Sequence, residues 1–497
     1  MQITKKLIIT NTLWSAVAQV LVMGINLLVL PLFIKNLGAE LFGIWVISNV
    51  VLGYLSVFDF GFTQGLQKYV AEARVKGDDK ELSEVVVSGV GLLLIIGLLL
   101  GGIFWIGASS IVEFFNIQPE NQRIATQLLK ISALFCIVMW PLRIVDVVLN
   151  ASMRIKELGF LNAFKTGAQS IVMLGMVYYA ADIVSIKWVT TGLMAVCSAY
   201  GMVVVKKYVP EICWRPNYFK FQQIKRMHKF SLGMFYLAVL GMLSVRIDNL
   251  VIGKLLGMNM VAVYAIIAKP YELINRIGNM MMQTLMPATF NLLPSSTREQ
   301  KEKLVCLGVK YRTLILVPMT VVSIYAIPSF LRLWVGEEYL QYAIWAQLFS
   351  AVHLFMGLAS LGNIARADGA MRLVNCMLTV KVFSNVAMSI LLTLRLGVGG
   401  VIMGTFISNI FFGEVLFGGW ISKKMGIRFG LVLRNFFPVL IVGVICLLPL
   451  LFIKYSANSW LSLMMFSSIF YLVLVAVIIV MFLREQVLKL LYRGGVL

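Results

Sequence analysis

The sequence has few charged residues and almost no histidine. Charged residues make up 13% of its 497 positions, whereas soluble domains carry about 25%. Its two histidines and six cysteines show no spacing typical of a metal site or a disulfide framework, so we expect neither. It also lacks a GxxxxGK[ST] loop, and we expect no ATP hydrolysis within the chain and no bound cofactor.

The sequence is rich in apolar residues. The hydrophobic content is 60% and the mean hydropathy is +0.90. Apolar runs of roughly 18 to 25 residues recur along the chain, and each is long enough to cross about 30 Å of hydrocarbon. The pattern predicts an all-α polytopic membrane protein with about 14 spans, approximately 12–34, 39–60, 84–107, 125–149, 161–181, 187–205, 231–256, 261–290, 311–330, 341–363, 373–394, 399–421, 430–453 and 460–483.

The charge balance is strongly basic, with a formal net charge of +21. In a soluble protein this would suggest a nucleic-acid partner. Here most of the 43 Lys and Arg residues fall in the loops on one side of the predicted spans. That bias predicts that both termini are cytoplasmic, and the basic face attracts the anionic head groups of membrane lipids. We therefore expect no nucleic-acid partner.

A basic loop divides the chain into two halves. Residues 207–230, with two prolines, are predicted to be a cytoplasmic linker between an N-terminal lobe, 1–206, with spans one to six, and a second lobe, 231–421, with spans seven to twelve. Residues 422–497 hold two further spans with almost no charge and a cytoplasmic tail, and they are predicted to be peripheral.

One turn of the first half recurs in the second half. FIKNLGAELFGIW aligns without gaps on IGKLLGMNMVAVY, which places Gly38 on Gly257 and Trp45 on Tyr264. Six predicted spans separate the two copies, so the repeat is parallel. Transporters are often built from such repeats, with the substrate site near the midplane between them.

The seventh and eighth spans carry charges at a depth where hydrocarbon disfavours them. Arg246 and Asp248 lie in the seventh span, and Lys269, Glu272 and Arg276 lie in the eighth. The last three share one helix face because their spacing is i, i+3, i+7. Intramembrane charges usually face a cavity, a substrate or a partner. Two interpretations remain open, a charged stripe that lines an aqueous cavity beside a kink at the proline that follows Lys269, or internal ion pairs between the two spans.

Other spans add isolated charges. Arg143 and Asp146 lie three residues apart in the fourth span and can neutralise one another, whereas Lys381 in the eleventh span and Glu414 in the twelfth each stand in an apolar context. The summed intramembrane charge is positive. A cavity with that balance attracts an anion.

Three segments show a family resemblance. They are FDFGFTQGLQKYVAEARVKGD after the second span, RIDNLVIGKLLGMNMVAVYAIIAKPYELI at the seventh and eighth, and LRLWVGEEYLQYA at the end of the ninth. The chain resembles the Wzx-type O-antigen and lipid-linked oligosaccharide flippases of the multidrug, oligosaccharidyl-lipid and polysaccharide exporter superfamily. The resemblance implies two lobes around a central cavity in the bacterial inner membrane. It also implies that a polyprenyl-diphosphate-linked oligosaccharide moves from the cytoplasmic to the periplasmic leaflet by alternating access.

The resemblance also implies roles for the intramembrane charges. The residues expected to bind the diphosphate or another anionic head group are Arg246, Lys269, Arg276, Arg143 and Lys381. Those expected to couple transport to a proton or sodium gradient, or to pair with the cations, are Asp248, Glu272, Glu414 and Asp146. Other polysaccharide-assembly membrane proteins are possible partners.

Two other classes remain as alternatives. A drug exporter of the same superfamily should have an acidic cavity if its substrates are cations, and the charge count here has the opposite sign. A membrane glycosyltransferase or polymerase should show a sizeable extramembrane loop with catalytic carboxylates or histidines, whereas the predicted outer loops are short. We therefore expect a transporter and not an enzyme.

Overall fold

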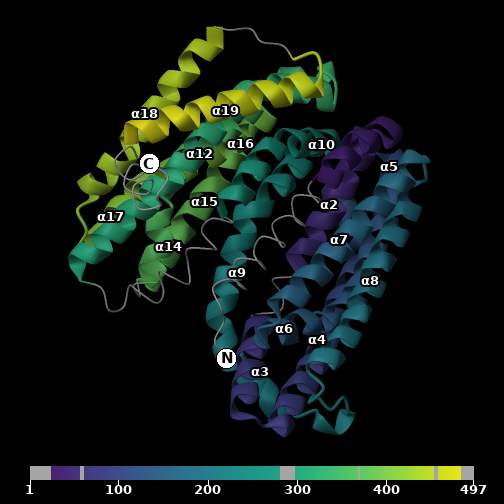
Figure 1. Cartoon of the computed structure of the whole chain (residues 1–497). Helices are drawn as coiled ribbons and strands as arrows, with labels where there is room; N and C mark the ends of the chain where they lie inside the picture. Colours follow the sequence, from purple (N-terminus) through teal and green to yellow (C-terminus); the bar gives the residue numbers. More distant parts are fainter. Residues whose placement is uncertain (1–23, 56–60, 280–296, 368–369, 453–456, 483–497) are drawn as a thin grey trace. The chain divides into compact units, whose positions relative to one another are not determined.

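The computed structural model describes the chain apart from residues 1–23, 56–60, 280–296, 368–369, 453–456 and 483–497, and the described part is helical with no strand (Figure 1). By contacts the chain forms two units, Met1–Ala262 and Val263–Leu497. The predicted all-α class is confirmed. Parts of the first two and the eighth predicted spans, and the start of the FDFGF segment, lie outside the described residues.

The first unit contains one apolar helix, Gly24–Leu37, followed by helices α2 to α9. Their bounds are α2 Ala39–Leu55, α3 Phe62–Lys76, α4 Asp79–Phe114, α5 Pro119–Leu142, α6 Ile144–Ala151, α7 Ile155–Tyr178, α8 Ile183–Tyr208, the short 3₁₀ helix η2 Pro216–Tyr218, and α9 Phe221–Leu255. Helix α10, Met258–Ile267, crosses the boundary between the units.

The second unit continues with a helix over 269–279 and then long and broken helices in alternation. Their bounds are α12 Arg298–Trp334, η4 Glu337–Tyr342, α13 Ala343–Ala351, η5 Val352–Leu354, α14 Ser360–Ala367, α15 Met371–Leu396, α16 Val398–Ile407, the π-helix η6 Ser408–Val415, α17 Leu416–Lys424, α18 Phe429–Phe452 and α19 Trp460–Phe482.

Eight helical segments of the described residues are long and apolar enough to cross a membrane. Their outward faces carry large apolar side chains, such as Leu99 on α4, Val196 on α8 and Leu394 on α15, each more than 60% exposed. Exposed apolar surface of this extent is unfavourable in water and favourable in contact with lipid. Together with the shorter apolar helices, these segments make the chain a multi-pass membrane protein.

The turn that recurs in the sequence also recurs in the backbone. Gly38 and Gly257 both have φ +86°, in the region that L side chains rarely adopt. A Cβ at either position would meet no atom within 4 Å, so the backbone conformation and not crowding requires glycine there. The alignment of Gly38 on Gly257 therefore reflects the same local structure in both halves.

Glycines let α4 and α5 approach one another closely. A Cβ at Gly97 would meet Trp140, and a Cβ at Gly101 would collide with Ile137. Small residues commonly fill such helix interfaces in membranes, where backbone approach and van der Waals contact replace the hydrophobic effect. The two helices form a tight pair on which α8 also packs.

The connection between α8 and α9 belongs to the first unit. The backbone N–H groups of Cys213 and Lys220 donate to Ser83 Oγ and Ser88 Oγ of α4 at 2.9 and 2.8 Å. Helix α9 packs on α2, α3 and α4. The contacts thus group α9 with the first unit, whereas the sequence assigns it to the second lobe, and the predicted lobes of six spans each stay a prediction.

Candidate functional site

The charged stripe of the eighth span lies on the helix 269–279. Helix α10 ends at Ile267, one turn residue follows, and the chain resumes helical conformation at 269. Pro270 explains the break, since it cannot donate to the carbonyl one turn earlier. At the start of the helix 269–279, Lys269 Nζ lies 2.8 Å from Glu272 Oε2. The internal pairing that the sequence left open is therefore formed between these two residues.

The Lys269–Glu272 pair is not sealed in the interior. The two side chains are 30% and 46% exposed. One turn further along, Arg276 is exposed and makes no ion pair with any residue that the structure describes. The stripe therefore carries a net charge of +1, with one guanidinium available to a ligand.

The seventh span supplies one buried carboxyl group. Asp248 on α9 is 6% exposed. Arg246 lies two residues earlier on the same helix, and the description does not extend to its side chain. Its role in anion binding stays a prediction.

The ion pair expected between Arg143 and Asp146 does not form. Arg143 caps the end of α5 and the start of α6, the helix that carries Asp146, and its carbonyl accepts from the N–H of Val147. The guanidinium of Arg143 lies 4.8 Å from the centroid of the Trp140 ring, in a cation–π contact. Arg143 therefore lies one turn before Asp146 without a direct ion pair to it among the described contacts.

Lys381 and Glu414, which the sequence left as isolated charges, lie on neighbouring segments. Helix α15 carries Lys381, whose Nζ lies 3.3 Å from the place where a Cβ on Gly413 would be. Gly413 and Glu414 belong to the π-helix η6. Short π-helical segments are frequent at functional sites because they open the regular backbone ladder. The structure thus places Lys381 beside the backbone of η6, and the description does not extend to the side chain of Glu414.

The first unit contains a buried lysine that is not among the predicted site residues. Lys187 on α8 is 0% exposed, and its ammonium donates to Ser48 Oγ at 3.1 Å and Asn49 Oδ1 at 2.9 Å. It also lies 4.8 Å from the centroid of the Trp45 ring. No carboxylate of the described residues contacts it, so neutral groups of α2 solvate the charge.

A signal for Lys187 was present in the sequence. Asp182 caps α8, its carboxylate accepting from the N–H groups of Val184 and Ser185 at 3.0 and 2.9 Å. Hydrogen bonding lowers the pKa of Asp182, first from the Ser185 side chain and then from the Ser185 backbone N–H. Reading Asp182 as a helix start would have placed Lys187 a full turn inside the sixth span and not at its edge.

Two further polar residues of the second unit are buried and were not among the predicted site residues. Arg312 on α12 is 3% exposed and His353 on η5 is 0% exposed. Arg312 lies in the ninth predicted span and His353 in the tenth.

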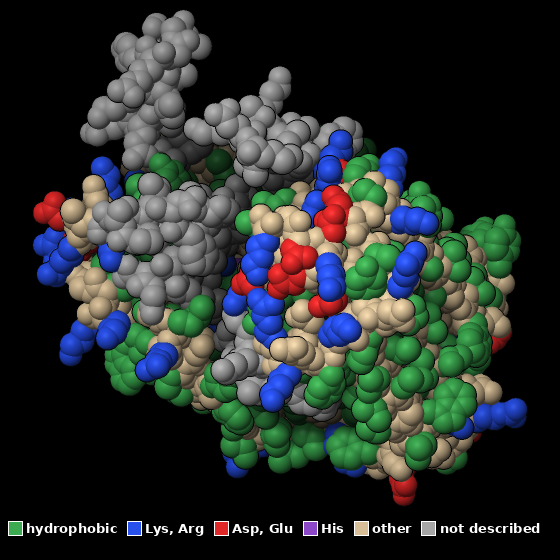
Figure 2. Space-filling model, turned by 90° about the horizontal axis from the view of Figure 1, so that it is seen from below, with side chains coloured by type: hydrophobic (Ala, Val, Ile, Leu, Met, Phe, Trp, Pro, Cys, Tyr) green, Lys and Arg blue, Asp and Glu red, His purple; other side chains and the backbone are tan. Residues whose placement is uncertain are grey.

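Charged side chains of both signs gather on the face seen in Figure 2. Arg226 at the start of α9 contacts Glu81 of α4 at 2.6 Å and Glu72 of α3 at 3.5 Å, and its guanidinium lies 4.5 Å from the centroid of the Tyr69 ring. The hydrogen bond to Glu81 raises the pKa of Arg226. The contacts of Arg226 hold the start of α9 against α3 and α4.

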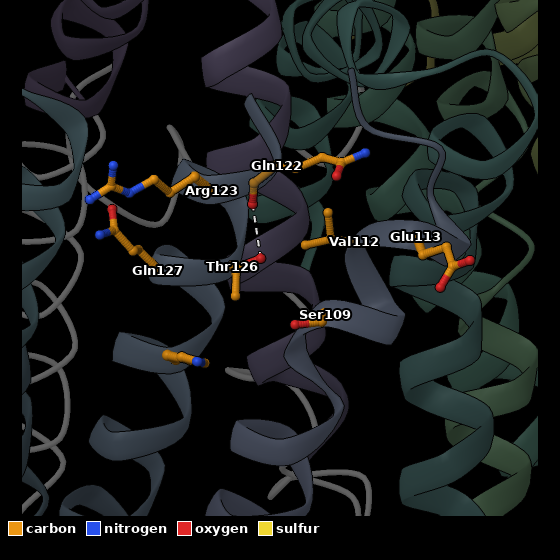
Figure 3. A pocket seen from close by; sticks show the side chains of 8 residues that line it. Ser109, Val112, Glu113, Gln122, Arg123, Thr126 and Gln127 are labelled. Carbon is orange, nitrogen blue, oxygen red and sulfur yellow. Dashed lines mark hydrogen bonds between the residues drawn. The ribbon is translucent and has the colours of Figure 1, made fainter. Parts of the chain in front are cut away.

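A cavity of about 610 Å³ lies where α4 turns into α5 (Figure 3). Glu113 and Arg123 point in opposite directions in this view, and the one hydrogen bond drawn joins Thr126 to the backbone of Gln122. The cavity contains none of the residues predicted to bind the anionic head group. We do not assign the substrate to it.

The all-helical, multi-pass architecture has the fold of the MurJ and MATE transporters, as two solved structures show. The solved structure of the lipid II flippase MurJ in an inward closed conformation matches 96% of this chain and 100% of its own, with a TM-score of 0.74 at 14% identity. An inward-facing multidrug resistance MATE family transporter matches 81% of this chain and 94% of its own, with a TM-score of 0.66 at 13% identity. At these identities the likeness shows the fold.

The sequence comparisons show the family. The model of the polysaccharide biosynthesis protein family matches residues 37–344, and the chain belongs to that family. A protein named "Putative O-antigen transporter" from Shigella flexneri is 24% identical over 67% of this chain and 78% of its own. A protein of the same name from Salmonella typhimurium is 22% identical over 65% of this chain and 74% of its own.

Proposed function

We propose that this protein moves a polyprenyl-diphosphate-linked oligosaccharide, such as an O-antigen repeat unit, between the leaflets of the bacterial inner membrane. The family and the relatives named as O-antigen transporters support a surface-polysaccharide substrate. Arg276 is the observation that carries the proposal within this chain. It is an exposed guanidinium at membrane depth without an ion-pair partner among the described residues, and a diphosphate would supply one.

Lys269 has a different part in this proposal. Its ammonium already holds the Glu272 carboxylate at 2.8 Å. A diphosphate bound at Arg276 would compete with Glu272 for Lys269, since the three side chains share one helix face. The released carboxylate could then bind a proton or a sodium ion, which would link substrate binding to an ion gradient.

The test is transfer of a labelled lipid-linked oligosaccharide between leaflets in proteoliposomes. We expect Arg276→Ala to lower the rate about tenfold or more, because a hydrogen bond to a charged group contributes about 1.5 to 3 kcal/mol and 1.4 kcal/mol is a factor of ten. Arg276→Lys should retain part of the rate, since it keeps the charge but loses the planar donor fork.

Arg395→Ala is the matched control, because Arg395 on α15 is also an exposed arginine without an ion pair among the described residues. An Arg276→Ala rate equal to that of the control would contradict the role of Arg276. Transport of cationic drugs in place of the lipid-linked oligosaccharide would favour the drug-exporter alternative.

A further inference from the structure

The cavity of about 610 Å³ between α4 and α5 is lined largely by polar side chains (Figure 3). Four of its lining residues on α5 share one helix face because they are spaced i, i+3, i+4 and i+7, namely Arg123, Thr126, Gln127 and Lys130. Ser109 contributes a hydroxyl group from α4. Further along the pair, Gly97 and Gly101 bring the two helices together. The cavity therefore lies where close packing of α4 on α5 gives way to polar side chains.

The two cations of this cavity have no carboxylate partner among the described residues. Arg123 is exposed, and Lys130 Nζ lies 5.4 Å from the centroid of the Trp105 ring, in a cation–π contact. Glu113 is the one carboxylate of the lining, and in Figure 3 it extends away from Arg123 and Gln127, whose side chains extend to the other side. The lining thus carries a net charge of +1, with the guanidinium directed away from the carboxylate.

The cavity lies at the level of a membrane interface. In the predicted topology Arg123 precedes the fourth span, 125–149, and Lys130 lies about 7.5 Å inside it at 1.5 Å per residue. Trp105 lies two residues before the end of the third span, 84–107. Tryptophan is typical of this level, and lysine side chains there extend toward the lipid head groups. The two spans meet on the side opposite the predicted basic loops, so the general attraction of those loops for lipid does not account for the cavity.

Below the polar residues, both helices present apolar side chains on the faces that line the cavity. Leu98 and Trp105 share the face of Ser109 on α4, and Leu134 and Val138 continue the polar face of α5 at multiples of about 3.6 residues. The four apolar side chains are between 39% and 50% exposed. A polar cavity above two half-exposed apolar faces matches the shape of a lipid, whose acyl chains lie below its head group.

We propose that this cavity binds the head group of an anionic membrane phospholipid, with the acyl chains on the apolar faces of α4 and α5. Arg123 donates as a planar fork to two phosphate oxygens, and Lys130 adds a point charge from below. Ser109 and Gln127 supply a hydroxyl and an amide group for the glycerol and ester oxygens. The net charge of +1 favours a head group with a net negative charge over a zwitterionic one.

This lipid site does not depend on the proposed function. The transported substrate is assigned to Arg276, which does not line the cavity. A sugar would use the hydroxyl and amide groups of the lining but would leave Arg123 and Lys130 without a counterion, so a phospholipid fits the lining better. Lipid binding is measured without transport, and the failure of one proposal can therefore be told from the failure of the other.

The first test is native mass spectrometry of the full chain in detergent micelles, titrated with phosphatidylglycerol or with phosphatidylcholine of identical acyl chains. We expect phosphatidylglycerol to bind about fivefold more tightly or better, and Arg123→Ala and Lys130→Met each to weaken its binding about fivefold. Arg123→Lys and Lys130→Arg keep the charge and should retain most of the affinity.

Arg395→Ala is the matched control, because Arg395 is an exposed arginine near the end of α15, has no ion pair among the described residues and does not line the cavity. It should bind phosphatidylglycerol as the unsubstituted chain does. Equal affinity for the two lipids would overturn the proposal. So would an Arg123→Ala chain that binds phosphatidylglycerol as tightly as the Arg395→Ala chain.

The second test distinguishes a membrane lipid from smaller ligands of similar chemistry. Soluble glycerol 3-phosphate carries a phosphate without acyl chains, and we expect it to displace phosphatidylglycerol only at a concentration about a hundredfold higher or more, because it buries no chain on α4 and α5. Displacement at equal concentration would overturn the lipid assignment in favour of a soluble phosphate. Displacement by a soluble neutral oligosaccharide would overturn it in favour of a sugar site.

Discussion

Lys187 offers a quantitative test of how the first unit holds a buried positive charge. Its ammonium is fully buried, with hydrogen bonds to Ser48 and Asn49 and the Trp45 ring nearby. Each hydrogen bond to a charged group contributes about 1.5 to 3 kcal/mol, and a desolvated cation–π contact contributes about 2 kcal/mol. Against these stands a desolvation penalty of several kcal/mol for a buried ion.

The favourable and unfavourable contributions of Lys187 to the free energy of unfolding nearly cancel. Removing only one partner of the ammonium upsets this balance, because the desolvation penalty remains. We therefore expect Lys187→Met to change the free energy of unfolding by no more than about 2 kcal/mol in either direction. Ser48→Ala should lower it by about 1.5 to 3 kcal/mol, because the lysine loses an acceptor and Ser48, 1% exposed, is not replaced by bulk water. In the Lys187→Met background, Ser48→Ala should cost about 0.5 to 1.5 kcal/mol, as for a hydrogen bond between neutral groups.

The assay is the unfolding of the purified chain by SDS in mixed micelles, followed by circular dichroism, over the full double-mutant cycle. Ser132→Ala is the control, since Ser132 is a buried serine of the same unit whose hydroxyl has no hydrogen-bond partner among the described residues. A coupling energy below about 0.5 kcal/mol between Lys187 and Ser48 would refute the reasoning, because contacting partners of a buried charge should not behave additively.

Two further predictions concern the same unit. Gly43→Ala should destabilise it by about 1 to 3 kcal/mol, since the Cβ would collide with the Met258 carbonyl, whereas Gly102→Ala, with no atom within 4 Å, should be neutral or stabilising by up to about 1 kcal/mol in the same unfolding assay. Asp182→Ala should cost about 0.5 to 2 kcal/mol at neutral pH. Because the pKa of Asp182 is lowered in the folded chain, its contribution is present above the ordinary value of 3.8 and is lost as the pH falls below it. Unfolding at neutral pH and at about pH 3 should therefore show the cost of Asp182→Ala shrinking, and a cost independent of pH would contradict the capping role.

The sequence could predict features that depend on neighbours along the chain. Composition and apolar runs predicted the helical membrane class. The aligned turns predicted equivalent backbone at Gly38 and Gly257, where both φ values are +86°. The spacing of Lys269 and Glu272 predicted that they share a helix face, and they form an ion pair there.

Spacing alone did not decide which neighbour a charged side chain contacts. Arg143 and Asp146 have the i, i+3 spacing of a pair, and Arg143 caps the helix that carries Asp146. The guanidinium nevertheless lies 4.8 Å from the centroid of the Trp140 ring. Spacing places two residues on one helix face, but packing decides what a long side chain contacts.

Contacts between segments that are distant along the chain could not be predicted from the sequence. Nothing in the sequence near Lys187 indicates that Ser48 and Asn49, some 140 positions away, would accept its hydrogen bonds. The ring of Tyr271, on another helix, lies 4.5 Å from the ring of His353. Such sites are defined by packing, which a single sequence does not reveal.

The described cations differ in how their charge is satisfied, and this difference ranks them as ligands for a diphosphate. Lys187 is solvated by neutral groups and closed to any ligand, and Lys269 is held by a carboxylate that an anion could displace. Arg276 is exposed and has no ion pair among the residues described. A substrate gains most from the cation that the protein itself leaves least satisfied, because no existing interaction has to be broken. Arg276 should therefore dominate the binding of the anionic head group, and Lys269 should contribute only after Glu272 has moved.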